Sequence, residues 1–281
     1  MGMKKEMLTI FNHDRNIFKS KYIYPVISRR SMGLSLGINL NTNNACNWQC
    51  IYCQVSGLTL GKPETIDLNL LENELDTWLE KIVNGSFLND CASHKVGFKD
   101  IAFSGNGEPT ATPEFESIVQ IVLKKIVKFK LSKIIKLRLI TNGSYLNKKN
   151  VRHGLGLMKD LDREVWFKID QVKPEGALII NRINLSTKSL ETNLKAAIST
   201  SPTIVQTCLL RINKERPSNI FISDYIKFLK PYASQLKAIH LYSLARPSQQ
   251  KTDLQIDALN SDELKMIADK MSTLKTKIEC Y

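Results

Sequence analysis

Three cysteines lie within eight residues, Cys46-Asn-Trp-Gln-Cys50-Ile-Tyr-Cys53, in the spacing C-x3-C-x2-C. Thiolates are preferred ligands of soft metals and of iron–sulfur clusters. A structural zinc site normally has four ligands, whereas three thiolates suit a four-iron cluster that they hold at three of its irons. The last iron would then stay open to an outside ligand. The spacing therefore predicts a reactive [4Fe-4S] centre bound by Cys46, Cys50 and Cys53.

The other cysteines, Cys91, Cys208 and Cys280, are scattered along the chain. Secreted disulfide frameworks are shorter and much richer in Cys, so a disulfide scaffold is not expected. Zinc stays an alternative, because Cys91 or His94 could supply a fourth ligand. That alternative describes a zinc-stabilised nucleic-acid-binding protein without catalysis.

The 281 residues are 43% hydrophobic and 24% charged, as in an ordinary globular protein. No stretch approaches the roughly 18 apolar residues of a membrane span, and the N-terminus lacks the apolar run of a signal peptide. We therefore expect a cytoplasmic protein without membrane attachment. The net charge of +13 has two readings. A basic surface attracts polyanions such as tRNA, but a Lys-rich composition also spreads charge without forming a site.

A short β-rich run, a turn and an amphipathic segment of helical period recur along the chain. Strands are expected at residues 36–40, 100–104, 136–140, 165–170, 204–212 and 238–244, and helices near residues 68–83, 113–129, 151–161, 190–200, 224–231 and 262–274. This alternation favours parallel pairing, because each crossover needs a helix to return the chain. We predict an α/β fold, a partial (β/α)6 TIM-like barrel with parallel strands and outer helices. Residues 1–34 are expected to form an N-terminal extension and residues 35–281 the barrel domain.

In such a barrel the working site lies at the C-terminal ends of the strands. The cysteine loop, the turn Gly105-Asn-Gly-Glu-Pro109 and the turn Thr141-Asn-Gly143 all follow expected strands. Either glycine turn alone would be an ordinary strand-to-helix connection. Together with the cysteines they predict one shared site.

Alternation along the strands indicates which side chains face the lumen. The outer face must pack against helices, so the polar residues should point inward and need partners there. These are Asn39, Ser104, Asn142, Lys168, Asp170, Gln206, His240 and Tyr242. We take Lys168, Asp170 and His240 as candidate catalytic residues. Arg29 and Arg30 could grip a carboxylate bidentately or form ordinary surface ion pairs.

The cysteine spacing, with aromatic Tyr52 before the third Cys, resembles the signature of the radical S-adenosylmethionine (SAM) superfamily. Gly105–Pro109 resembles the GGEP motif of that superfamily, with Asn106 in place of a glycine. The blocks SRR…SLGINL, CIYCQ, FSGNGEPT, ITNG and LYSLARP resemble one branch, the small radical SAM proteins grouped with wyosine-type tRNA-modifying enzymes. The resemblance spans about residues 25–247.

The resemblance implies two cofactors, a [4Fe-4S] cluster and SAM. An electron from a donor such as flavodoxin or ferredoxin would cleave SAM into methionine and a 5′-deoxyadenosyl radical, which abstracts hydrogen from a substrate. That substrate would be tRNA or another nucleic acid, otherwise a small molecule or peptide. The cofactor-binding residues would be Gly105, Gly107 and Glu108 for the methionine moiety, the Tyr52 backbone for adenine, and Thr141 or Asn142 for the ribose side.

Overall fold

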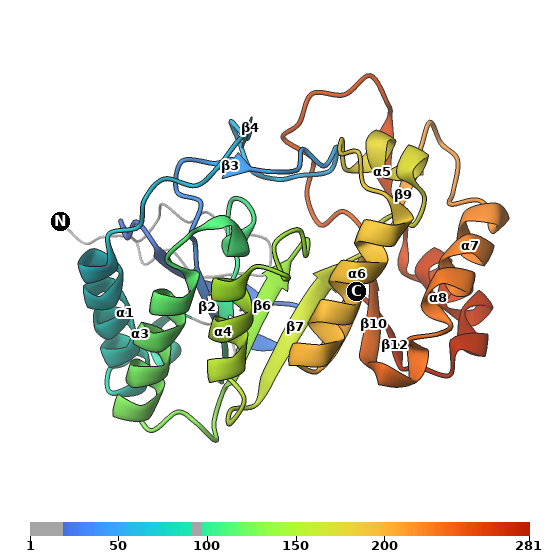
Figure 1. The fold of residues 1–281 in the computed structure, drawn as a ribbon. Coiled ribbons are helices and arrows are strands. Elements are labelled where there is room, and N and C mark those ends of the chain that lie inside the picture. The colour runs from blue at the N-terminus through green and yellow to red at the C-terminus, as the bar shows by residue number, and fades with distance from the viewer. Residues whose placement is uncertain (1–18, 92–96) are drawn as a thin grey trace.

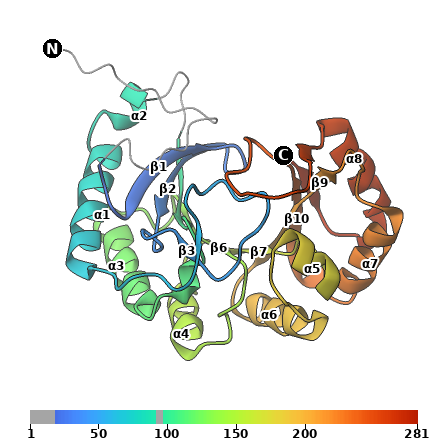
Figure 2. The ribbon, with the colours of Figure 1, turned by 90° about the horizontal axis from the view of Figure 1, so that it is seen from above.

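A computed structural model describes residues 19–91 and 97–281 of the chain. Its centre is an eight-stranded sheet in the order β1-β2-β5-β6-β7-β8-β10-β12, with helices on the outer side of the curved sheet (Figures 1 and 2). All neighbours in this order are parallel except β1 and β2. The predicted α/β partial barrel is confirmed.

The six expected strands are present in the expected order. They are β2 (Gly33–Ile38), β5 (Phe98–Phe103), β6 (Lys136–Thr141), β7 (Arg163–Lys168), β8 (Thr203–Cys208) and β10 (Leu236–Tyr242). The six expected helices are α1 (Leu68–Val83), α3 (Phe115–Lys128), α4 (Lys149–Leu157), α6 (Thr187–Thr200), α7 (Asn219–Leu229) and α8 (Ser261–Lys270). Additional short helices are α2 (Phe87–Cys91), α5 (Pro174–Ile180) and the 3-10 turns η1 (Pro109–Ala111), η2 (Ala233–Gln235) and η3 (Ser272–Leu274).

Two further strands extend the sheet at its edges. β1 (Ile23–Ser28) pairs antiparallel with β2, and β12 (Ile278–Cys280) pairs parallel with β10. The added strands occupy backbone groups that β2 and β10 would otherwise leave open. The expected boundary after residue 34 falls inside β2, because the β1–β2 hairpin belongs to the main sheet. The division into extension and domain stays a prediction.

The strand expected at residues 204–212 is present as β8, but its expected continuation to residue 212 is wrong, because the chain leaves the main sheet after β8. The N–H of Leu209 donates to the carbonyl of Tyr242 at 2.8 Å. The next segment, β9 (Leu210–Ile212), pairs instead with β11 (Ile256–Ala258). A second small pair joins β3 (Ala45–Cys46) to β4 (Thr59–Leu60), at the start of the cysteine loop.

Side chains on the two faces of the sheet differ as the alternation predicts. Val165 and Phe167 of β7 belong to the main hydrophobic core beneath the helices. Trp166 and Lys168 of the same strand line the cavity inside the barrel. Among the described residues, no helix is both long enough and apolar enough to cross a lipid bilayer.

Candidate active site

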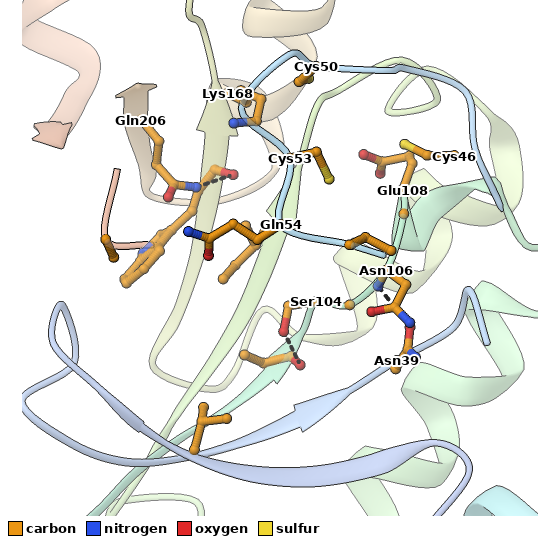
Figure 3. Close-up of a pocket in the computed structure, with 18 of the residues that line it drawn as sticks. Asn39, Cys46, Cys50, Cys53, Gln54, Ser104, Asn106, Glu108, Lys168 and Gln206 are labelled. Atoms are coloured by element: carbon orange, nitrogen blue, oxygen red, sulfur yellow. Dashed lines mark hydrogen bonds between the residues drawn. The ribbon is translucent and has the colours of Figure 1, made fainter. Parts of the chain in front are cut away.

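The cysteine loop follows β2 and crosses the C-terminal ends of the strands. Its three cysteines line a single cavity of about 1150 Å³, together with residues of both glycine turns (Figure 3). The parallel strands β2, β5 and β6 end at this edge of the sheet, which brings the three sequence-predicted segments together. Hydrogen bonds to the neighbouring strand ends then fix the loop from several sides.

The turn after β5 is bonded to the start of the loop. Asn39 Oδ1 accepts from the backbone N–H of Asn106 at 3.0 Å and from that of Asn41 at 3.2 Å. Asn106 Nδ2 in turn donates to Asn44 Oδ1 at 2.5 Å. Gly105 permits this contact, because a Cβ there would lie 2.2 Å from Asn39 Oδ1. The residue that departs from the GGEP pattern therefore contributes a direct bond to the loop.

Gly107 approaches the same loop even more closely. A Cβ at this position would lie 2.3 Å from the carbonyl oxygen of Ala45 and 2.7 Å from the side chain of Asn41. Asn41 Nδ2 donates to that carbonyl at 2.9 Å. Asn41 Oδ1 is a buried acceptor that has no hydrogen-bond partner in the part of the chain that the structure describes. Such an acceptor suits a bound ligand that carries a donor.

Glu108 joins the two glycine turns. The carboxylate of Glu108 is buried. Its Oε1 accepts hydrogen bonds from the N–H of Thr110 at 3.1 Å, from the Thr110 hydroxyl at 2.5 Å and from the Thr141 hydroxyl at 2.6 Å. Oε2 accepts from the N–H of Asn142 at 2.7 Å. Burial raises the pKa of Glu108 although these bonds oppose the shift. Each carboxylate oxygen has two lone pairs, so Oε2 keeps capacity for one more donor, such as a ligand ammonium.

The turn after β6 binds the part of the loop between the first two cysteines. Asn142 Nδ2 donates to Asn47 Oδ1 at 2.9 Å, and Trp48 Nε1 donates to the Ser144 hydroxyl at 3.1 Å. The N–H of Gly143, a residue with φ of 80°, donates to the Thr141 hydroxyl at 2.8 Å. Asn142 is thus occupied in holding the loop as well as lining the cavity.

Two cysteine sulfurs accept hydrogen bonds from nearby amides. Asn181, the residue after α5, donates from Nδ2 to Cys50 Sγ at 3.2 Å and accepts from the N–H of Gln49 at its carbonyl. The N–H of Trp48 donates to Cys46 Sγ at 3.4 Å. Hydrogen bonds to sulfur stabilise thiolate charge and tune iron–sulfur centres. Asn181 carries no motif in the sequence, and sequence reasoning missed it.

Burial governs the protonation of these thiols in the metal-free protein. It raises the pKa of Cys46 to about 12 and that of Cys50 to about 11. Thiols with such pKa values stay protonated at neutral pH, so metal binding must release their protons. No group of three His, Cys, Asp or Glu side chains within residues 19–91 and 97–281 is arranged to hold a single ion. Cysteines of a four-iron cluster each bind a different iron and need not converge on one point.

The segment after β10 closes the fourth side of the loop. Arg246 Nη2 donates to Gln54 Oε1 at 2.6 Å, and Gln54 Nε2 donates to the carbonyl of Arg246 at 2.9 Å. The Ser248 hydroxyl donates to the carbonyl of Ile51 at 2.7 Å, and the N–H of Gln249 donates to that of Cys53 at 2.9 Å. In the sequence, only the block LYSLARP indicated that this segment belongs to the site.

Lys168 and Asp170 meet the cysteine loop through Tyr52. The Tyr52 hydroxyl donates to Asp170 Oδ2 at 2.5 Å and accepts from Lys168 Nζ. Lys168 also donates to the Tyr242 hydroxyl at 3.0 Å, and Asn181 donates to Asp170 Oδ2 at 2.7 Å. Lys168 lines the cavity, whereas Asp170 is fully buried behind Tyr52. The side chain of Tyr52 therefore belongs to this network; the predicted backbone contact with adenine stays a prediction.

His240 lies apart from the other two candidates. Its Nε2 is 2.9 Å from Glu279 Oε2, and its ring packs edge-on against Trp166 and Tyr281. It is buried and is not among the residues that line the cavity. The structure therefore places Lys168 at the cavity, Asp170 one contact behind it, and His240 in the wall of the barrel. Their catalytic roles stay predictions. Of the zinc alternative's extra ligands, the side chains of Cys91 and His94 lie outside the described residues.

The family model described as the Radical SAM superfamily matches residues 40–216, which include the three cysteines and both glycine turns. The chain belongs to the radical SAM superfamily. The enzymes of this family use SAM together with a [4Fe-4S] cluster. This match counts against the alternative of a zinc-stabilised protein without catalysis.

Two curated proteins have sequences similar to that of this chain. The chain is 26% identical to "GTPase Obg" of Brachyspira hyodysenteriae over 234 residues, which are 77% of this chain and 32% of that protein. It is 28% identical to "UPF0026 protein MJ1312" of Methanocaldococcus jannaschii over 215 residues, 74% of this chain and 60% of that protein. The chain therefore spans less than two thirds of the length of each.

Several solved structures have a fold similar to that of this chain. TYW1 with a lysine-pyruvate adduct bound superposes with a TM-score of 0.58 at 17% identity, covering 94% of this chain and 80% of that one. A radical SAM methyltransferase from Sphaerobacter thermophilus has a TM-score of 0.61 at 8% identity, covering 92% and 68%. At these identities the likeness concerns the fold alone.

Gly107→Ala should loosen the contact between the two loops. The added methyl group would overlap the Ala45 carbonyl, so we expect the free energy of unfolding to fall by about 1–3 kcal/mol in urea titrations. Gly156→Ala is the matched control, because Gly156 lies in helix α4 and an added Cβ there would meet no atom within 4 Å. It should stabilise the protein by about 0.5–1 kcal/mol. Equal midpoints for Gly107→Ala and the wild type would contradict the close approach.

Protonation of His240 should destabilise the folded state. Burial and the charge of Arg30 lower the pKa of His240 from 6.5 to about 4. The unfolded chain thus binds this proton first, so the stabilisation is complete above about pH 6.5 and is lost as the pH falls toward 4. Its full loss amounts to at most about 3 kcal/mol. In denaturant titrations from pH 7 to 4, His240→Phe should flatten this slope, whereas His153→Phe, at an exposed site, should keep it. An unchanged slope in His240→Phe would assign the loss to other groups.

Proposed function

We propose that Cys46, Cys50 and Cys53 hold a [4Fe-4S] cluster and that the enzyme abstracts hydrogen from a substrate in the barrel. One observation carries the proposal: the three cysteines line the same cavity as the two glycine turns, and hydrogen bonds join those turns to the cysteine loop. When bound, the cluster and SAM supply reductive cleavage of a C–S bond, which yields methionine and a 5′-deoxyadenosyl radical.

The residues beside the cysteine loop suit the methionine end of SAM. Glu108 Oε2 and Asn41 Oδ1 offer acceptor capacity for the ammonium group. Gly105 and Gly107 leave no side chain between that ammonium and the loop. Thr141 and Asn142 line the adjacent wall and would face the ribose side, while the backbone of Tyr52 would meet the adenine.

The neighbouring network would orient the substrate and exclude water from the reactive centre. Lys168 carries its charge in the cavity, since burial would lower its pKa but Asp170 holds the pKa well above its usual value. Tyr52 and Tyr242 enclose this ammonium group from two sides. We assign Lys168 to direct substrate contact and Asp170 to positioning Lys168 and Tyr52. His240 would act through the packing of Trp166.

For the substrate we propose tRNA or another nucleic acid, on the net charge of +13 and on the sequence resemblance to wyosine-type enzymes. The alternative is a small metabolite or a peptide, favoured by the enclosed position of Lys168 inside the barrel. A donor such as flavodoxin or ferredoxin would supply the electron. No GTPase activity is proposed, because the sequence contains no G-x-x-x-x-G-K-[ST] motif.

Removal of one proposed ligand tests the assignment directly. Cys50→Ala, reconstituted with iron and sulfide without oxygen, should bind less iron and form at least about 100-fold less 5′-deoxyadenosine from SAM with a reductant. Mutation of a residue that only hydrogen-bonds to a metal ligand typically lowers metal affinity or activity about 10–100-fold, so loss of a ligand itself should lower them more. Cys280→Ala is the control, since Cys280 lies in β12 away from the cavity. Wild-type protein that makes no 5′-deoxyadenosine would overturn the proposed activity.

A comparison of cells with and without the gene tests the substrate class. If the substrate is tRNA, one modified nucleoside should disappear from hydrolysed tRNA, and tRNA should bind the purified protein with an affinity that falls steeply with salt. Unchanged nucleosides together with a changed metabolite or peptide would favour the alternative.

A further inference from the structure

Six cationic side chains line the cavity: Lys21, Arg29, Arg30, Arg138, Lys168 and Arg246. Three of them, Arg30, Arg138 and Lys168, lie over the rings of Trp166 or Tyr242 inside the barrel. Arg138 is fully paired, because its guanidinium contacts Asp100 and lies 2.9 Å from Glu164 Oε2. Lys168 Nζ lies 3.6 Å from Asp170 Oδ2. Two of the three positive charges therefore have carboxylate partners within the protein.

Arg30 has no such partner. Across residues 19–91 and 97–281, its one hydrogen bond runs from Nη1 to Gln206 Oε1, and no Asp or Glu oxygen lies within ion-pair distance. Burial and the neighbouring arginines lower its pKa. A guanidinium has five N–H groups, so four of them have no acceptor among the residues that the structure describes. A half-buried cation without a counter-charge is costly unless a ligand supplies one.

The guanidinium is nevertheless held in a defined place. Its Cζ lies 4.8 Å from the ring centroid of Trp166 and 5.2 Å from that of Tyr242. Gln206 fixes one edge and is itself held, since Gln206 Nε2 donates to the carbonyl of Trp166 at 3.1 Å. Stacking on aromatic faces leaves the edge of a guanidinium available for a planar or tetrahedral anion. The arrangement is that of a preorganised anion-binding group.

Arg30 and Lys168 approach the same point from different elements. Arg30 lies in the turn between β1 and β2, at the end of the barrel opposite the cysteine loop. Lys168 ends β7 and pairs in register with Gln206 of β8. Lys168 Nζ lies 5.7 Å from the Tyr242 centroid, so both cations flank one ring. Figure 3 shows Lys168 and Gln206 on the same side of the cavity, to the left of Cys53.

We propose that Arg30, assisted by Lys168, binds a compact oxyanion of the substrate, a carboxylate or a phosphate, inside the barrel. That the anion belongs to the substrate rests on the proposed function, whereas the anion site itself rests on the contacts of Arg30. With the anion held at Arg30, the remainder of the substrate extends toward the cysteine loop. The site thus selects substrates in which an anionic group and the reacting carbon lie at different ends.

Calorimetric titration of the reconstituted protein with inorganic phosphate and, separately, with malonate tests the site and distinguishes its two sources of oxyanion. At least one anion should bind the wild type, and Arg30→Met should weaken that binding at least about 10-fold, because charge-assisted bonds to a guanidinium are lost. Methionine keeps an unbranched side chain beside Trp166. Arg152→Met, which removes the same charge from an exposed residue of α4 that does not line the cavity, should change the affinity less than about 3-fold.

The outcomes separate this inference from the proposed function. Failure of both anions to bind, or equal losses in Arg30→Met and Arg152→Met, would overturn the anion site. Iron content and 5′-deoxyadenosine formation of the same wild-type preparation test the proposed function. Protein that binds an anion through Arg30 but makes no 5′-deoxyadenosine would overturn the proposed function and leave the anion site in place.

Discussion

The cysteine loop is irregular, and its shape depends on hydrogen bonds to three strand ends and one helix end. A loop of this kind has few backbone bonds of its own, so its polar groups need partners elsewhere. Asn106, Asn142, Asn181 and Gln249 supply them from the turns after β5 and β6, from the end of α5 and from the segment after β10. The sulfur positions are therefore a property of the whole barrel. A ligand loop supported from one side alone would leave the thiols free to move apart.

Two buried carboxylates connect those supports to one another. Glu108 accepts bonds from both glycine turns, and Asp170 accepts from the Tyr52 hydroxyl, from Asn181 and, at 2.9 Å, from the N–H of Cys208. Each carboxylate ties adjacent strand ends through several donors. Networks of this kind are rigid when every polar group in them is hydrogen-bonded. Loss of one donor would leave a carboxylate oxygen without a partner in a low-dielectric interior, which is costly. These two buried acids thus connect the segments that hold the loop in place.

The sequence was sufficient for the six parallel strands, the outer helices and the three segments at the site, because period and strand-end position determine them. Other features depend on tertiary pairing. β1 reads Ile-Tyr-Pro-Val-Ile-Ser, with apolar residues on both faces, and it becomes a strand only through its partner β2. Asn181 reaches Cys50 from a helix end more than 100 residues away. His240 has the predicted inward position in the alternation, but Trp166 and Tyr281 surround its ring and separate it from the cavity.

Net charge and local charge are separate properties of this molecule. The excess of +13 is spread over the chain and describes how the surface attracts polyanions at long range, an effect that salt screens. Inside the barrel, Arg138 and Lys168 are compensated by acids, and the chain's positive excess contributes little there. Arg30 differs from these two, because among the described residues its guanidinium has aromatic faces and an amide around it but no carboxylate. In the proposed function, the basic surface would attract an anionic substrate first, and Arg30 would then bind its anionic group inside the barrel.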